Sequence, residues 1–301
     1  MTTAPGAYLS QKSVTIVIPC MNEEGNLERL FEYLEETFQS LGYTLPVVLI
    51  DDGSTDGTAQ ILSRLRQTCR FLTVLRHAHN RGVAEVWNTA LAHVKTDWIL
   101  WGQADLESDP RTDIPALLAA CSPGVDAIAG WRQGRGDGKL GASSLANRAC
   151  RWAFGLQIHD MNWIKLVRRD RLAQLPINLI THRYLLAVIA GQGHRVIEVP
   201  TPWHPRFSGA SKFGRGRLFT AAADFLRVTG WFYVLQPLET AHRYGRIALE
   251  AAHVGMRAAG HAFRLKASSP QTTPQRQPLP SGSAVANIAY YRQLALSKVS
   301  A

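Results

Sequence analysis

Short apolar runs alternate with amphipathic segments along the first 100 residues of the chain. The runs are rich in β-branched and other apolar residues and predict buried strands at 14–18, 46–50, 71–75 and 98–101. Between them, apolar residues recur at helical spacing and predict helices at about 23–40, 56–67 and 82–94. Pro19 is expected to end the first strand, and Asn22 to cap the first helix. This alternation predicts an α/β fold with a mostly parallel sheet.

The middle of the chain is less regular. Residues 130–141 are rich in glycine and basic residues and predict a mobile loop. Helices near 142–154 and 183–191 are expected to flank a last strand at 195–199.

After Lys212 the pattern becomes amphipathic. A helix with an apolar stripe that includes Phe225 and Phe232 is followed by a second helix with a basic face, and residues 267–284 are rich in serine, proline and glutamine. We therefore predict an α/β domain over 1–212, amphipathic basic helices over 213–266, a disordered linker over 267–284 and a tail over 285–301.

Charge is unevenly distributed. The formal net charge is +10, and residues 203–266 hold ten Lys and Arg against three Asp and Glu. This region therefore predicts an anionic partner, which can be a lipid, a phosphate or a nucleic acid. Nucleic acid is the least favoured of the three, because no nucleic-acid recognition motif accompanies the charge.

Cysteine spacing and hydropathy indicate the compartment of the protein and its relation to the membrane. The four cysteines lie far apart, which predicts buried thiols in a reducing compartment and neither a disulfide framework nor a zinc site. The first residues lack the apolar core of a secretion signal, and no run reaches 18 consecutive apolar residues. We expect a soluble or peripheral protein.

Two acidic clusters follow predicted strands. Asp51 and Asp52 could accept hydrogen bonds from a base and a ribose, with Gly53 allowing a close approach; the alternative is a polar turn in which Asp56 caps the next helix. Asp105 and Glu107, two residues apart in an extended segment, would point to the same side and could hold a divalent cation. The alternative for them is a solvated acidic loop before a proline.

The ordered series of these motifs resembles the polyprenyl-phosphate glycosyltransferases of family 2, the group of dolichol-phosphate mannose synthase and its bacterial undecaprenyl-phosphate relatives. The resemblance covers about residues 14–235. The matching segments are Ile18 to Glu24, Ile50 to Thr58, Asn80 to Gly82, Ala104 to Leu106 with Asp109 and Pro110, His182 to Leu185, Glu198 to Pro200 and Arg206 to Lys212.

The resemblance implies a GT-A fold and a set of site residues. It implies a nucleotide site of Pro19, Asn22, Glu23, Asp51 and Asp52, an Mg²⁺ or Mn²⁺ site of Asp105 and Glu107, and a catalytic group of Asp105, Gln103 and Arg132. The metal would neutralise charge on the departing nucleoside diphosphate. In the family an acidic residue stands where this chain has Gln103, and Gln often stands at the position of Glu107. We therefore expect a shifted metal site and not an inactive one.

The implied acceptor explains the basic residues. A lipid monophosphate is already anionic at neutral pH. It therefore has less need of a general base than of cations that hold it in line with the donor carbon. The acceptor-phosphate residues would be Arg206, Ser211 and Lys212, with Arg135 on the glycine-rich loop. A hydroxyl acceptor would instead need a base such as Asp160 or Asp137, and a catalytically silent nucleotide-sugar-binding protein is the third alternative.

Aromatic residues after Lys212, among them Trp231 and Tyr233, suit a helix that lies in the headgroup region of a membrane, but the same stripe could pack on the catalytic domain or make a dimer. We thus predict metal-dependent, inverting transfer of a hexose from a nucleotide-diphosphate sugar to a polyprenyl phosphate. The protein would be peripheral at the cytoplasmic face of the membrane, and a homo-oligomer is possible.

Overall fold

The computed structural model describes residues 13–134, 140–208, 217–238 and 250. Contacts divide the chain into two units, residues 1–239 and 240–301, and all elements described below belong to the first unit. The predicted second amphipathic helix, linker and tail lie outside the described residues, apart from residue 250.

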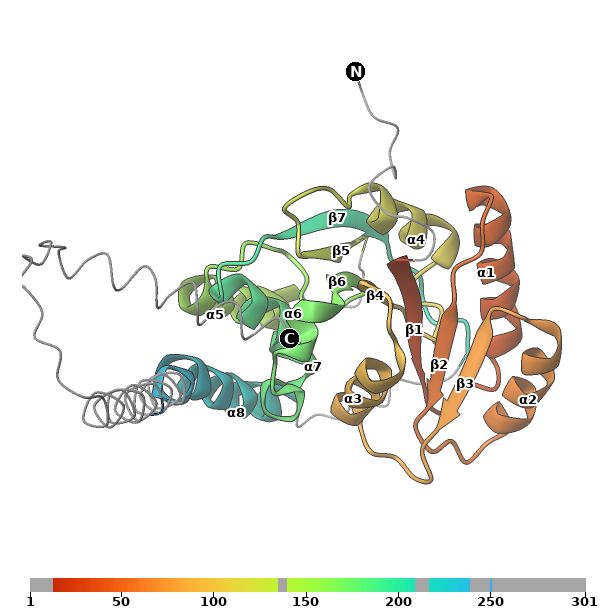
Figure 1. Cartoon of the computed structure of the whole chain (residues 1–301), viewed down its shortest axis with the longest axis horizontal. Coiled ribbons are helices and arrows are strands. Elements are labelled where there is room, and N and C mark those ends of the chain that lie inside the picture. Colours follow the sequence, from red (N-terminus) through yellow and green to blue (C-terminus); the bar gives the residue numbers. More distant parts are fainter. Residues whose placement is uncertain (1–12, 135–139, 209–216, 239–249, 251–301) are drawn as a thin grey trace, which may run out of the picture. The chain divides into compact units, whose positions relative to one another are not determined.

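The described residues form one seven-stranded sheet with the order β3-β2-β1-β4-β6-β5-β7 (Figure 1). Among these strands only β6 runs antiparallel to its neighbours, β4 and β5. The strands are β1 (Val14–Cys20), β2 (Val47–Asp51), β3 (Leu72–Arg76), β4 (Trp98–Trp101), β5 (Ala127–Gln133), β6 (Lys165–Arg168) and β7 (Val196–Pro202). The predicted α/β fold and its first four strands are confirmed.

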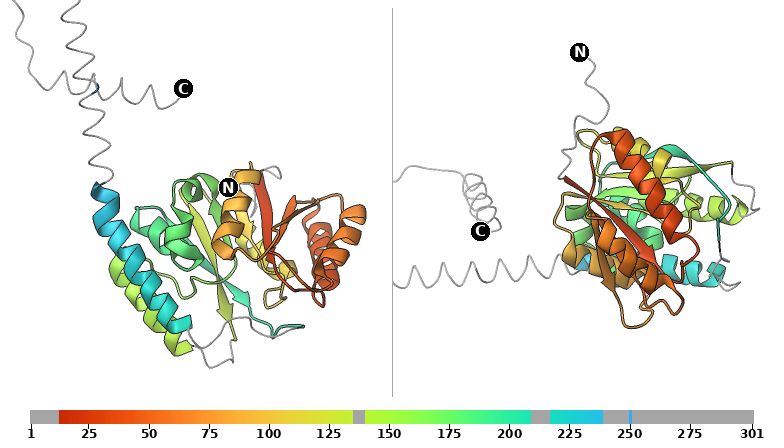
Figure 2. Two further views of the ribbon diagram at one scale, coloured as in Figure 1. Left: turned by 90° about the horizontal axis from the view of Figure 1, so that it is seen from below. Right: turned by 90° about the vertical axis from the view of Figure 1, so that its right-hand side faces the viewer.

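Helices cover both faces of this sheet (Figures 1 and 2). One apolar cluster joins the sheet to α3, α5, α7 and α8, and the other joins it to α1, α2 and α4. β1, β2 and β4 are apolar on both faces because both faces are covered. The helices are α1 (Leu27–Leu41), α2 (Thr58–Thr68), α3 (Val83–His93), α4 (Pro110–Ala119), α5 (Leu140–Phe154), α6 (Arg169–Ala173), α7 (Ile177–Gly191) and α8 (Arg217–Gly230), followed by the π-helical turn η2 (Trp231–Leu235).

The first strand and helix differ from the prediction at their junction. β1 continues through Pro19 to Cys20, because pairing with β4 ends at Val17 and the proline lies beyond it. α1 begins only at Leu27, so Asn22 is not its cap. Asn22 instead has a φ of 51° and turns the chain out of the strand.

The prediction of a mobile loop at 130–141 is wrong in its first part, because residues 130–133 belong to β5. Gly130 is needed inside that strand: an added Cβ would lie 2.7 Å from Ile164 and 2.8 Å from Trp163. Glycine here marks close packing and not flexibility. Residues 135–139 lie outside the described part of the chain.

The apolar stripe of α8 packs on the domain. Phe225 and Phe232 lie edge-on to Phe154 of α5, with ring centroids 6.3 and 5.2 Å apart. The Tyr184 hydroxyl donates to the carbonyl of Ala221 at 2.7 Å. Phe225 and Phe232 of the stripe therefore pack on the domain, as the alternative to a membrane-facing stripe predicts.

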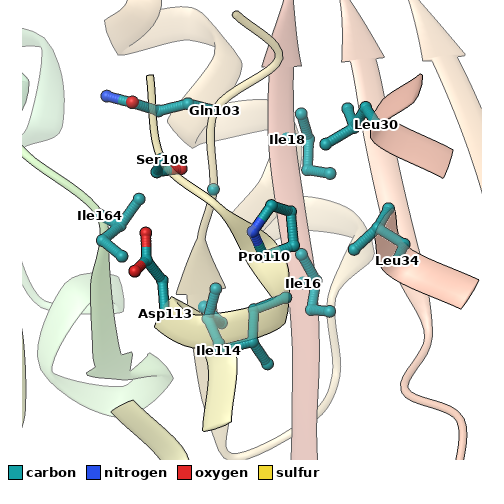
Figure 3. Close-up of a pocket in the computed structure, with 12 residues that line it drawn as sticks. Ile16, Ile18, Leu30, Leu34, Gln103, Ser108, Pro110, Asp113, Ile114 and Ile164 are labelled. Atoms are coloured by element: carbon teal, nitrogen blue, oxygen red, sulfur yellow. The ribbon is translucent and has the colours of Figure 1, made fainter. Parts of the chain in front are cut away.

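A buried carboxyl group supports the loop after β4. Asp113 of α4 is 1% exposed, and its Oδ2 accepts the backbone N–H of Asp109 at 3.1 Å while its Oδ1 accepts the Thr112 hydroxyl at 3.1 Å. Figure 3 shows Asp113 beside Ile164 in a small, mostly apolar cavity beneath the loop. Burial raises the pKa of Asp113 to about 7, although its hydrogen bond from Thr112 lowers the pKa.

This carboxyl group makes stability depend on pH. Because the pKa is about 7 in the folded chain against an ordinary 3.8, the folded state binds more protons between those values, and stability falls as pH rises through them. In Asp113→Asn, Oδ1 can accept from Asp109 and Nδ2 can donate to Thr112, without a buried charge. We expect the free energy of unfolding in urea to vary less between pH 5 and 8 for this variant than for the wild type.

The matched control is Asp170→Asn, because Asp170 is half-exposed and the pKa of its carboxyl group is lowered, despite burial that raises it, by hydrogen bonds from Arg168. This control should keep the wild-type slope over the same range. An Asp113→Asn slope equal to that of the wild type would contradict the prediction.

Candidate functional site

The loops that carry the predicted site residues meet at one edge of the sheet. β1, β2, β4, β5 and β7 all have their carboxyl ends there, and the antiparallel β6 begins there. β1 lies between β2 and β4, so the chain leaves this point in both directions along the sheet. Such a switch point is where open α/β sheets bind ligands.

Reciprocal hydrogen bonds join the loop after β1 to the loop after β2. The Asn22 N–H donates to Ser54 Oγ at 2.8 Å, and Asn22 Oδ1 accepts the Thr55 N–H at 2.8 Å. The Glu23 N–H donates to Thr58 Oγ1 at 2.8 Å. Asn22 and Glu23 thus help to build the wall of the site, and their contact with a nucleotide stays a prediction.

Asp51 and Asp52 have different hydrogen-bond partners and different structural roles. Asp52 accepts the N–H groups of Arg81 and Gly82, both at 2.8 Å, and contacts His77 Nδ1 at 2.7 Å, so it holds the start of α3. Asp51 is fully buried, and its Oδ1 accepts the Ser54 N–H at 2.9 Å.

Asp51 Oδ2 lies 3.2 Å from Arg76 Nε, an ionic contact whose geometry is not that of a hydrogen bond. This oxygen accepts no hydrogen bond from the described residues. Asp51 is therefore the member of the pair with acceptor capacity left, whereas Asp52 is committed to the protein.

Gly53 is required by the protein itself. Its φ is +75°, and an added Cβ would lie 2.4 Å from the carbonyl carbon of His79 and 2.5 Å from the backbone nitrogen of Asn80. A ligand was expected to approach closely at Gly53. In the structure the loop between β3 and α3 packs there.

The loop after β4 brings two carboxylates onto one cation. Asp105 Oδ2 lies 2.9 Å from Nη2 of Arg206, and Glu107 Oε1 accepts a hydrogen bond from Nε of the same guanidinium at 2.6 Å. The intervening Leu106 has a φ of 57°, so the segment turns instead of running extended. The two carboxylates nevertheless share one side, as predicted. Arg206, expected at the acceptor phosphate, instead lies against the predicted metal ligands.

Burial and neighbouring charges set the properties of this cluster. Burial raises the pKa of Asp105 to about 6; Arg206 lowers it, and Glu107 and Glu23 raise it. Burial lowers the pKa of Arg206, but the hydrogen bond to Glu107 and the charges of Asp105, Glu107 and Glu23 raise it above its usual value. Glu23 of the first loop therefore lies within electrostatic reach of Asp105, which joins the two predicted clusters.

The donor set suits a hard divalent cation. Both carboxylates already contact a single positive group, and Mg²⁺ is commonly bound by one or two carboxylates together with substrate phosphates. Within the described residues there is no group of three or more His, Cys, Asp or Glu that could hold a metal without such a substrate. In the loop after β4, Gln103 Oε1 is buried and accepts no hydrogen bond from the described residues. Gln103 also lines the cavity of Figure 3.

A second charged cluster lies between β5 and β6. Arg132 forms a two-point ion pair with Asp160, and its guanidinium lies 4.6 Å from the centroid of the Trp163 ring. Lys165 is buried beside them and donates to the carbonyl of Met161 at 3.0 Å. Burial lowers its pKa to about 8, while Asp160 raises it and Arg132 lowers it.

This cluster changes two expectations. Arg132 was expected to act on the reacting groups, but in the structure it is paired with Asp160. Asp160 was the candidate general base for a hydroxyl acceptor, yet both of its oxygens accept from Arg132. The sequence did not indicate the buried Lys165, because one lysine in a short apolar strand has no motif of its own.

The remaining predicted residues are only partly described. Arg135, Ser211 and Lys212 lie outside the described residues, as does Asp137. Ser208, the last described residue before position 209, accepts a hydrogen bond on its carbonyl from Asn26 Nδ2 at 3.3 Å. The segment after β7 therefore runs beside the loop after β1 as well as the loop after β4.

Solved structures share this fold. The chain is similar to a mannosyltransferase from Pyrobaculum calidifontis in complex with GDP-Man and Mn²⁺ (TM-score 0.51, 21% identity, 84% of this chain and 80% of the other). It is also similar to glucosyl-3-phosphoglycerate synthase from Mycobacterium tuberculosis with Mn²⁺, UDP and phosphoglyceric acid (TM-score 0.57, 18% identity, 73% and 79%). These likenesses establish the GT-A fold.

Relatives by sequence have more specific names. The chain is 26% identical over 253 residues to dodecaprenyl-phosphate galacturonate synthase of Rhizobium johnstonii, covering 81% of this chain and 73% of the relative. It is 28% identical over 218 residues to undecaprenyl-phosphate 4-deoxy-4-formamido-L-arabinose transferase of Edwardsiella ictaluri, covering 71% and 66%.

The sequence model for glycosyl transferase family 2 matches residues 15–173, which is more than half of the chain. The matched range runs from the second residue of β1 past the end of β6 and contains both acidic clusters. The sheet, the loops at its carboxyl edge and this match agree: the chain belongs to glycosyl transferase family 2 and is a glycosyltransferase with the GT-A fold.

Proposed function

We propose that this glycosyltransferase moves a sugar from a nucleoside-diphosphate donor to a polyprenyl phosphate, with inversion at the sugar carbon, at the cytoplasmic face of a membrane. The observation that carries the proposal is the contact of Asp105 and Glu107 with one guanidinium, that of Arg206. It brings a pair of cation-binding carboxylates next to a side chain suited to phosphate. The names of the relatives, which refer to dodecaprenyl and undecaprenyl phosphate, support this acceptor class.

Asp105 and Glu107 would hold Mg²⁺ or Mn²⁺. A divalent ion there supplies positive charge that stabilises the departing nucleoside diphosphate. The complexes of structural neighbours with Mn²⁺ and Mg²⁺ support the metal. The chain's own residues would supply the remaining order: Asn22 and Ser54 hold the two nucleotide loops together, and the buried Asp51 holds the turn at Ser54 at the end of β2.

A phosphate acceptor fits the charges better than a hydroxyl. A phosphate monoester is already an anion at neutral pH and attacks without losing a proton, so it needs no general base. Asp160, the described candidate for such a base, has both oxygens occupied by Arg132. Neither oxygen of this carboxylate is therefore free to take the proton of a hydroxyl acceptor, which disfavours the hydroxyl alternative.

A transfer assay tests the function. The protein is incubated with a panel of labelled UDP- and GDP-sugars, a polyprenyl phosphate and Mn²⁺, and the label is counted in the organic phase. We expect one donor to transfer its label, and Asp105→Ala to reduce that transfer by about 100-fold or more, since it removes a charge-stabilising ligand.

Asp170→Ala is the matched control, because Asp170 is a half-exposed carboxylate paired with Arg168, and it should keep the wild-type rate. Transfer by Asp105→Ala at the wild-type rate would contradict the proposed mechanism. Nucleotide binding without transfer to any lipid phosphate would favour the silent binding protein.

Exposed apolar side chains support an approach to the membrane. Among the described residues no helix has the length and apolar character needed to cross a bilayer. Trp152 of α5 is nevertheless 86% exposed, and the hydroxyl of Tyr233 contacts the neighbouring Ala153 carbonyl. We name as the apolar patch the exposed residues Trp152, Leu226, Tyr233, Val234, Leu235 and Leu238. Exposed arginines at 148, 151 and 227 accompany it in sequence, and this mixture suits an anionic lipid interface.

Charge placed in the apolar patch should weaken membrane binding. We expect Leu226→Glu with Leu238→Glu to bind vesicles of phosphatidylglycerol and phosphatidylethanolamine at least about tenfold more weakly than the wild type, since each buried leucine contributes about 1.5–3 kcal/mol. Co-sedimentation measures the bound fraction. The control pair Ser63→Glu and Gln67→Glu adds the same charge on exposed positions of α2.

Equal loss of binding in both pairs would contradict a specific role of the patch. A change from dimer to monomer in analytical ultracentrifugation, with unchanged vesicle binding, would identify the patch as a dimer face instead.

A further inference from the structure

Arg206 occupies the place between the two proposed metal ligands. Its Nη2 lies 2.9 Å from Asp105 Oδ2, and its Nε donates to Glu107 Oε1 at 2.6 Å. The three side chains are 15–20% exposed. One guanidinium therefore offsets part of the negative charge of two partly buried carboxylates that would otherwise repel each other.

A divalent cation bound between Asp105 Oδ2 and Glu107 Oε1 would take the place that the guanidinium now holds. Two positive groups cannot share these oxygens at bonding distance without strong repulsion, because like charges a few ångströms apart interact strongly outside bulk water. The cation and the guanidinium are thus mutually exclusive occupants of this position. Whichever is bound, the carboxylates keep a counter-charge.

The backbone around Arg206 would allow an exchange without unfolding. On one side the Trp203 N–H donates to the Gln133 carbonyl at 3.2 Å and the His204 N–H donates to the Glu107 carbonyl at 3.0 Å. On the other side the Ser208 carbonyl accepts from Asn26 at 3.3 Å. These bonds hold the segment on both sides of Arg206, so the exchange would be a movement of its long side chain.

We propose that Arg206 is an exchangeable counter-ion: it holds Asp105 and Glu107 while the metal is absent, and metal binding displaces it so that its guanidinium binds the acceptor phosphate. This inference rests on the proposed function for the identity of the acceptor. The exchange couples the two ligands: the acceptor gains its arginine only after the metal and donor are bound. By reciprocity the acceptor phosphate also strengthens metal binding.

Mn²⁺ binding without nucleotide tests the competition. The wild type, Arg206→Gln and Arg111→Gln are titrated with Mn²⁺, and free Mn²⁺ is measured by electron paramagnetic resonance. We expect Arg206→Gln to bind Mn²⁺ about tenfold more tightly than the wild type, because the competing cation is gone. Arg111 pairs with Asp109 and Glu36, so Arg111→Gln should match the wild type.

Thermal melting verifies that Arg206→Gln is folded. Adding Asp105→Asn to Arg206→Gln should abolish the tighter Mn²⁺ binding, which would assign it to this site. Mn²⁺ affinity of Arg206→Gln equal to or below that of the wild type would overturn the proposal. Full transfer activity of the wild type in EDTA would also overturn it, because Arg206 would then be the permanent cation of the site.

Acceptor binding tests the second half of the exchange. Calorimetry with farnesyl phosphate, a short polyprenyl monophosphate, is run with and without Mn²⁺ plus UDP, and in parallel with GDP. The wild type should bind at least about tenfold more tightly when Mn²⁺ and the nucleotide are present, and Arg206→Gln should lose this gain. Equal wild-type affinity in both conditions would overturn the exchange.

The two proposals fail in different ways. If the chain transfers sugar to a polyprenyl phosphate but Arg206→Gln binds Mn²⁺ like the wild type, only the exchange is wrong. If no lipid phosphate accepts a sugar while Arg206→Gln binds Mn²⁺ more tightly, the proposed acceptor is wrong and the competition stands.

Discussion

Parallel pairing of β2, β1 and β4 is the constraint on which the site depends. The three strands are buried on both faces, so their registers are held by packing as well as by hydrogen bonds. Parallel strands must end at the same edge, and this brings together loops that begin after Cys20, Asp51 and Trp101, 31 to 81 positions apart in the sequence. The loops then fasten one another through Asn22, Ser54 and Thr55. The sheet therefore brings the site residues to one edge, and hydrogen bonds between the loops then fix their positions.

Charge balance is the second organising element. Each described carboxylate at this edge has a counter-charge or a set of N–H donors: Asp52 has the start of α3, Asp105 and Glu107 have Arg206, and Asp160 has Arg132. Partly buried carboxylates need such partners, because desolvation otherwise favours their neutral forms. In the proposed function, these internal pairs would be exchanged for pairs with a diphosphate, a metal and a lipid phosphate. Arg206 is the clearest case, since its two partners are the proposed ligands of the metal.

The second half of the domain carries the apolar patch of the proposed function. β5, β6 and β7 extend the sheet beyond β4, and α8 packs on α5 and α7 through Phe225 and Tyr184. The partly buried Phe225 and Phe232 pack on the domain, while Leu226 and Leu238 of the same segment remain exposed. An amphipathic helix can thus serve both packing and an interface, because its two sides satisfy different requirements.

The sequence by itself determined the α/β alternation, the first four strands and the two acidic clusters. The periodicity of apolar residues and the local composition indicate which residues are buried. It did not indicate that residues 130–133 form a strand, since Gly130 is explained only by Ile164 and Trp163 packed against it. Nor did it reveal that Asp52 serves α3, that Arg132 holds Asp160, or that Arg206 lies on Asp105 and Glu107. Those pairings join residues 28 to 101 positions apart, and only the folded chain decides which opposite charges meet.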